Sequence, residues 1–136
     1  MTRFVLDASV ALSWCFDDED DAYGRRVLGM LRMTDAIVPA IWRLEVANAV
    51  LVAERRRRLN SVDASRFLTL LEDLNIGVDS GTSVHAFNNT LQLARRYRLS
   101  AYDAAYLELA LREALPIATL DEDLRYAARK LGVDRI

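Results

Sequence analysis

Short runs of mainly apolar residues alternate along this chain with longer stretches of helical pattern. The runs cover residues 3–6, 36–38, 76–79 and 117–119, and apolar and polar residues do not alternate within them. Strands that are buried on both faces of a parallel sheet have this pattern, whereas strands with one solvated face alternate. The sequence therefore predicts an α/β fold, with a short parallel central sheet flanked by helices.

The segments between these runs have the composition of helices. We expect helices over residues 8–16, 41–58, 61–74, 83–97, 101–114 and 122–131, and a last strand over 133–136. Five consecutive acids, Asp17 to Asp21, indicate a solvated helix start. There is no internal repeat and no linker, so we expect residues 1–136 to form a single domain.

Charge and composition exclude several classes of function. The chain has 18 basic and 20 acidic residues, a net charge of −2, so it cannot bind nucleic acid through its overall charge. One cysteine and one histidine exclude a cysteine-based zinc site and a multi-histidine metal centre. No targeting signal is apparent and no apolar run approaches the ~20 residues of a membrane span, so we expect a cytoplasmic protein without membrane contact.

Two aspartates directly follow predicted strands. Asp7 follows the first apolar run, and Asp121 follows the run at 117–119. In open α/β sheets, binding sites form where the strands end, so both carboxylates could share one site. An aspartate between a strand and a helix can equally be a helix N-cap, and the sequence leaves that choice open.

A third acid, Glu45, lies in a strongly apolar helical segment. Between Leu44 and Ala53 the only polar residues are Glu45 and Asn48, which fall on one stripe of the predicted helix. A helix that is apolar nearly all round is expected to be buried. A buried carboxylate is costly unless it binds a metal or forms an ion pair, so a Glu–Arg pair is the alternative.

The fourth acid, Asp103, begins the segment predicted to be helical from residue 101. Ser100, three residues earlier, forms the pattern of a capping box with it, which gives a structural alternative.

One requirement explains all four acids: carboxylates that converge repel each other, and a divalent cation relieves the repulsion. An all-oxygen donor set selects Mg²⁺ or Mn²⁺ over zinc or iron.

Four segments in this order and spacing resemble the PIN-domain nucleases, and specifically the VapC-type toxins of toxin–antitoxin pairs. The segments are residues 4–9, 44–49, 99–107 and 118–124, and the resemblance extends over essentially the whole chain. It implies a PIN-like domain that cleaves RNA with a metal-activated water. It also implies that Asp7, Glu45, Asp103 and Asp121 are the catalytic acids.

The resemblance assigns further roles around these acids. Asp7 and Asp103 are the firmest metal ligands implied, and Glu45 ligates or acts as a base through water. Ser9 and Thr119 hold the site by hydroxyl hydrogen bonds, and Asp123 is a fifth candidate ligand unless it is only a favourable charge in a first helical turn. Asn48, on the same helical stripe as Glu45, is a further supporting candidate from the sequence itself. The resemblance also implies an antitoxin partner and a homodimer. The arginines that could flank the site and hold RNA phosphates are Arg95, Arg96 and Arg98.

Two other classes of α/β protein do not fit the sequence. A haloacid-dehalogenase-type phosphatase needs a second aspartate at the position of Ser9. A receiver domain needs a lysine at the end of a late strand, whereas Lys130 lies in a predicted helix. A PIN nuclease that is not a toxin, and a non-catalytic protein-binding module of the same fold, stay open from the sequence.

Overall fold

The computed structural model of the chain describes residues 2–16 and 21–136. Four short parallel strands form its sheet, in the order β3-β2-β1-β4. Their bounds are β1 Phe4–Leu6, β2 Ala36–Val38, β3 Ile76–Val78 and β4 Ile117–Ala118. The predicted α/β fold with a short parallel sheet is confirmed, and β2 has the predicted bounds.

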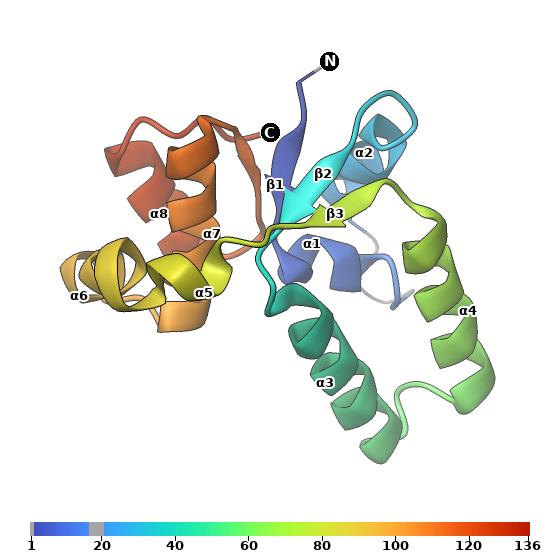
Figure 1. The fold of residues 1–136 in the computed structure, drawn as a ribbon. Helices are drawn as coiled ribbons and strands as arrows, with labels where there is room; N and C mark the ends of the chain where they lie inside the picture. Colours follow the sequence, from blue (N-terminus) through green and yellow to red (C-terminus); the bar gives the residue numbers. More distant parts are fainter. Residues whose placement is uncertain (1, 17–20) are drawn as a thin grey trace.

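Helices connect the strands and surround the sheet (Figure 1). The helices before β3 are α1 Ala8–Ser13, α2 Ala22–Met30, α3 Trp42–Arg55 and α4 Ser61–Asp73. Those after β3 are α5 Thr82–His85, the π-helical turn η2 Ala86–Thr90, α6 Leu91–Tyr97, α7 Ala101–Glu113 and α8 Glu122–Lys130. No helix in residues 2–16 and 21–136 is long and apolar enough to cross a membrane.

The core lies between the central strands and the helices packed on them. All three residues of β1 are fully buried, and so is Val10 of α1. In α7, the residues from Ala104 to Ala110 are buried, and this helix packs against β1. The most buried helix therefore runs beside the most buried strand, which fixes the position of Asp103 relative to Asp7.

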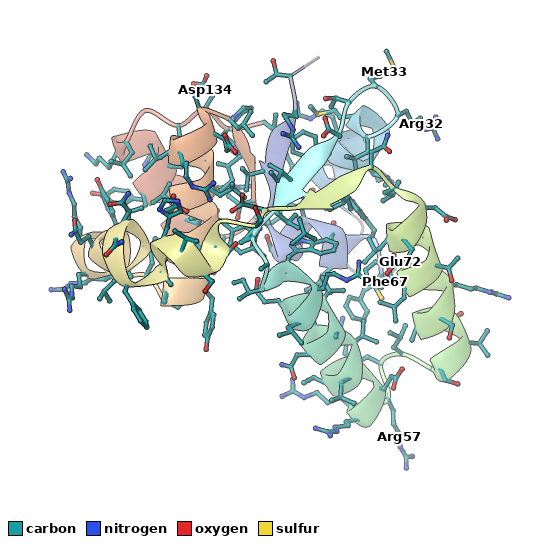
Figure 2. The ribbon with its side chains drawn as sticks, in the orientation of Figure 1. Arg32, Met33, Arg57, Phe67, Glu72 and Asp134 are labelled. Carbon is teal, nitrogen blue, oxygen red and sulfur yellow. The ribbon has the colours of Figure 1, made fainter. Side chains whose placement is uncertain are left out.

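Helices α3 and α4 extend away from the sheet and are joined at their far ends (Figure 1). Figure 2 shows Arg57 at the tip of this arm, where the backbone takes the left-handed conformation (φ 59°). The expectation that α3 is buried all round is wrong, because Leu44 is 74% exposed and Leu51 is 41% exposed. Only one face of α3, which includes Trp42 and Val46, packs into the core.

Two further expectations need correction. The predicted helix over 83–97 is divided by the π-helical turn η2, in which the backbone hydrogen bonds join residues five apart instead of four. The predicted last strand over 133–136 is reduced to one parallel bridge between Ile117 and Arg135. Of the acidic run, only Asp21 is described, and its side chain accepts a hydrogen bond from the Tyr23 N–H at 2.8 Å; Asp17 to Asp20 lie outside the described residues.

Candidate active site

The sheet register brings Asp7 next to Thr119. Leu6 of β1 is paired with Ala118 of β4, so the residues that follow each strand are neighbours. The backbone N–H of Asp7 donates to the Ala118 carbonyl at 2.9 Å, which continues the ladder by one bond. The Thr119 hydroxyl then donates to Oδ2 of Asp7 at 2.7 Å. A contact across 112 positions of sequence thus follows directly from parallel pairing.

Ser9 completes the hydrogen bonding at this end of the sheet. Its hydroxyl donates to the same Oδ2 of Asp7 at 2.6 Å, and accepts from the backbone N–H of Leu120 at 3.1 Å. The Thr119 hydroxyl accepts in turn from the backbone N–H of Asp121 at 3.0 Å. Two hydroxyls, those of Ser9 and Thr119, therefore bind the loop after β4 to the Asp7 carboxylate.

The two strand-end aspartates differ in what their side chains do. Asp121 is a true N-cap, because its Oδ1 accepts from the backbone N–H of Leu124 at 2.8 Å. Asp7 occupies the N-cap position of α1 without a side-chain cap hydrogen bond of full geometry, although the backbone N–H of Ser9 also acts on its carboxylate. It is nevertheless only 5% exposed. Helix capping therefore explains Asp121 in part and does not explain why a carboxylate is buried at position 7.

Asp103 lies in the first turn of α7, and Ser100 is the N-cap of that helix. The Ser100 side chain accepts from the backbone N–H of Asp103 at 3.0 Å, which is one half of a capping box. The Ser100 hydroxyl also acts on the Asp103 carboxylate and opposes the rise that burial causes in its pKa. The half-buried Asp103 carboxylate experiences the charges of Asp121 and Asp7.

Glu45 projects from the first turn of α3 and is half-buried. Its Oε1 accepts a hydrogen bond from the Tyr106 hydroxyl at 2.5 Å. No arginine of the described chain pairs with it, so the alternative of a buried Glu–Arg ion pair is wrong. Sequence reasoning missed Tyr106, although its place three residues after Asp103, on the same helical face, was a usable signal.

The acids influence one another electrostatically. Burial raises the pKa of Asp7, against the opposing hydrogen bonds from Ser9 and Thr119, and the charge of Asp121 raises it further. Burial also raises the pKa of Glu45, to which the charges of Asp7 and Asp103 add. For Asp103, burial is again the largest cause of a raised pKa, followed by the charges of Asp121 and Asp7. The fold thus concentrates negative charge where burial makes it costly.

The weaker candidates lie at the periphery. Asn48 is exposed on α3, and Asp123 is exposed in the first turn of α8, where its charge still acts on Asp103. Arg95 and Arg96 are exposed in the last turn of α6, and Arg98 follows as its C-cap in the left-handed conformation (φ 55°). Among residues 2–16 and 21–136, none of these three arginines forms an ion pair with an acid of the site.

The donor set suits a hard divalent cation in its chemistry. It consists of carboxylate and hydroxyl oxygens, and the mutual repulsion of the acids is what a cation would relieve. No three Asp, Glu, His or Cys side chains among the described residues lie close enough together to hold an ion as a group. This spacing is compatible with Mg²⁺, which is commonly held by one or two carboxylates and keeps several water ligands.

Comparison with solved structures finds the same fold elsewhere. A toxin–antitoxin complex from Klebsiella pneumoniae is similar with a TM-score of 0.62 at 16% identity, over 88% of each chain. VapBC2 from Rickettsia felis, solved with a DNA fragment from its promoter, gives 0.64 at 12% identity over 92% of each chain. FitAcB from Neisseria gonorrhoeae gives 0.65 at 20% identity, over 98% of this chain and 96% of that one.

Sequence comparison gives a family. No curated protein sequence matches the chain. The sequence profile of the PIN domain matches residues 4–130, which include every acid of the site described above. The strand-end carboxylates, their arrangement on a parallel sheet and this match agree, and the chain belongs to the PIN-domain family.

Proposed function

We propose that this protein is a metal-dependent ribonuclease that hydrolyses the phosphodiester bond of RNA. One observation carries the proposal: Asp7 is a buried carboxylate whose pKa burial raises, held by the hydroxyls of Ser9 and Thr119 and subject to the charge of Asp121. Its hydrogen bonds hold the loop after β4, but they do not remove the cost of burying this charge. Membership of the PIN-domain family supports nuclease chemistry.

The residues that would hold the ion are the acids of the site. Asp7 and Asp103 are the principal ligands in this proposal, with Glu45 and Asp121 beside them and Asp123 as a weaker candidate. Mg²⁺ or Mn²⁺ in such a site lowers the pKa of a bound water and stabilises the charge that develops on a phosphate. Glu45 is then the carboxylate placed to accept a proton from water or to ligate.

The other residues orient these groups. Ser9 and Thr119 fix one oxygen of Asp7, so the carboxylate cannot rotate freely. Arg95, Arg96 and Arg98 would contact phosphates of the substrate, which the overall charge of −2 does not attract. Asn48, one helical turn after Glu45 and exposed, would support the site only through a bound ligand.

The biological setting is also a proposal. The solved structures of similar fold include toxin–antitoxin complexes, which supports a toxin whose activity a cognate antitoxin blocks. We propose that residues 1–136 act as one nuclease domain, as a homodimer, in the cytoplasm. A short reading frame encoding a DNA-binding antitoxin directly upstream of the gene would support the toxin assignment, and its absence would favour a PIN nuclease of another kind.

Metal binding separates this function from a non-catalytic module of the same fold. Mn²⁺ added to EDTA-treated protein should raise the melting temperature, because an ion that binds only the folded state stabilises it. At a concentration of 100 times Kd, the gain is about 2.7 kcal/mol. A protein whose melting temperature does not respond to Mn²⁺ or Mg²⁺ would contradict the proposal.

A further inference from the structure

One buried hydroxyl group connects the elements that carry the site acids. The Tyr106 side chain is fully buried, and its hydroxyl donates to Oε1 of Glu45 at 2.5 Å. The backbone N–H of Ala8, the residue after Asp7, also acts on this hydroxyl. The Tyr106 hydroxyl, carried by α7, therefore lies close to the first turns of α1 and α3.

The position of Tyr106 on α7 is coupled to that of Asp103. The two residues are three apart in one helix, so they project from the same face about one turn from each other. Asp103 presents its charge toward Asp7 and Asp121, while Tyr106 reaches across to α3. A single rigid helix thus supplies one acid and holds another.

Glu45 depends on this contact for its orientation. Within the described chain, the Tyr106 hydroxyl is the one side-chain donor that reaches its carboxylate. A glutamate side chain has several rotatable bonds, and its neighbour Leu44 is 74% exposed, so packing on that side of α3 does not confine it. The hydrogen bond occupies Oε1 and leaves Oε2 for another ligand.

We propose that Tyr106 is a positioning residue of the metal site, which fixes the Glu45 carboxylate in the orientation that binds the ion. The inference rests on the proposed metal-dependent function. A role in stability alone would account for the buried ring, but it would not require the hydroxyl to bind a carboxylate of the site. The two roles differ in what happens to metal affinity when only the hydroxyl is removed.

The test measures Mn²⁺ binding to the full chain by isothermal titration calorimetry. Tyr106→Phe removes the hydroxyl and keeps the ring, and we expect it to bind Mn²⁺ roughly 10- to 100-fold more weakly than the wild type, as is typical when a partner of a metal ligand is lost. Tyr126→Phe is the matched control: Tyr126 is half-exposed on α8, its ring faces Arg129 and Lys130, and its loss should leave Mn²⁺ affinity unchanged.

A double-mutant cycle decides whether Tyr106 acts through Glu45. In a Glu45→Ala background the hydroxyl has no carboxylate to hold, so adding Tyr106→Phe should cause no further loss of Mn²⁺ affinity. An equal loss in both backgrounds would overturn the inference. A folded Tyr106→Phe variant with wild-type affinity would overturn it as well.

A measurement without any change at position 106 covers the case in which Tyr106→Phe does not fold. Mg²⁺ binding to the wild type should perturb the near-ultraviolet absorbance of tyrosine, and the perturbation should be absent from Glu45→Ala. Metal binding with no such perturbation would contradict the role proposed for Tyr106 and would leave the proposed metal-dependent function in place. A wild type that binds neither Mn²⁺ nor Mg²⁺ would overturn the proposed function, and this inference with it.

Discussion

Asp7 illustrates how a single residue can be unfavourable for folding and still be kept in place. Its carboxylate is 5% exposed and has two hydroxyl donors on one oxygen. Those hydrogen bonds reduce the cost of burying the charge, but burial still raises the pKa of Asp7. The hydrogen bonds therefore do not remove the whole cost. A cation near this carboxylate would offset the remainder, so the proposed function predicts that metal binding stabilises the protein.

The substitution Asp103→Asn should separate charge repulsion from helix capping. Asparagine keeps the shape and removes one of several mutually repelling charges, so the metal-free protein should gain on the order of 1 kcal/mol. For a domain of this size, that corresponds to a melting temperature higher by roughly 3–5 °C. Thermal unfolding in EDTA and in Mn²⁺ measures both this gain and the expected loss of most of the Mn²⁺ response.

Asn60→Ala is the matched control for this substitution. It removes the N-cap acceptor of α4, which takes the backbone N–H of Asp63 at 2.8 Å, and touches no site acid, so it should cost about 1 kcal/mol and preserve the Mn²⁺ response. An Asp103→Asn variant that melts lower than the wild type, still responds fully to Mn²⁺ and still cleaves RNA would remove Asp103 from the site.

Raised pKa values give the metal-free protein an unusual pH dependence. The pKa values of Asp7, Glu45 and Asp103 lie above the ordinary values of 3.8 and 4.5, so the folded state binds these protons more tightly than the unfolded state. The stability they contribute is complete below the ordinary values and is lost as the pH rises through the raised ones. In EDTA, the free energy of unfolding should therefore fall as the pH increases from about 4 to neutrality.

Denaturant unfolding at several pH values from about 5 to 8, with EDTA or Mg²⁺, tests this. The range avoids Asp79, whose pKa is lowered by Arg112 and whose contribution to stability is lost only at more acid pH. Saturating Mg²⁺ should reverse the trend, since deprotonated carboxylates bind the ion better. A metal-free stability that increases with pH over this range would refute the electrostatic account of the site.

At the scale of elements, the C-terminal half of α7 carries an ion-pair network. Arg112 donates to Oδ2 of Asp79 at 2.6 Å and to Oε2 of Glu108 at 2.8 Å. Both acids are buried, at 7% and 3% exposure, and Asp79 directly follows β3. This ion-pair network ties the helix that carries Asp103 to the edge strand of the sheet.

Replacing Arg112 should therefore be costly. Arg112→Met keeps much of the side-chain volume but leaves two buried carboxylates without their cation, and loss of one partner of a buried pair costs about 3–5 kcal/mol. Arg129→Met is the control, since Arg129 is exposed on α8 and its guanidinium lies over the ring of Tyr126, away from the two buried acids. Urea unfolding of both variants checks the difference, and similar midpoints would show that the network is unimportant for stability.

Local sequence patterns predicted much of the fold because they are properties of single elements. Apolar runs located the strands, and β2 has the predicted bounds. The burial of α3 was mispredicted, since apolar composition alone does not say which face of a helix finds a neighbour, and Leu44 finds none. The division of residues 83–97 by η2 likewise depends on packing against α7 and α6.

For the candidate site, the sequence predicts residues but not the contacts among them. Asp7 and Asp121 could be located from strand ends, but which of them caps a helix depends on backbone geometry that the sequence does not encode locally. The bond between Tyr106 and Glu45 spans 61 positions and joins two helices. Such a contact follows from the assembled fold and has no short-range signature.

At the scale of the whole molecule, the charge of the candidate site leads to a prediction about the proposed partner. An arginine or lysine from another protein can neutralise the site acids as a metal ion would. We predict that a cognate antitoxin inhibits by placing such a residue among Asp7, Glu45, Asp103 and Asp121. The purified complex should cleave RNA far more slowly than the free protein.

Replacing the basic residues of the partner one at a time should identify the inhibitory residue. The replacement that matters should restore cleavage without abolishing the complex, because binding would use a larger surface than one side chain. Equal cleavage rates for the complex and the free protein would reject this mode of inhibition, and would leave the nuclease assignment untouched.

Cleavage of single-stranded RNA under control of divalent metal tests the central claim most directly. We predict no cleavage by the EDTA-treated wild type, activity restored by Mg²⁺ or Mn²⁺, and no restoration in Asp7→Asn under conditions where that variant is folded. Asn60→Ala should keep the metal-dependent activity, since it changes the cap of α4 and no site acid. Full cleavage in EDTA, or undiminished metal-dependent cleavage by Asp7→Asn, would contradict the account.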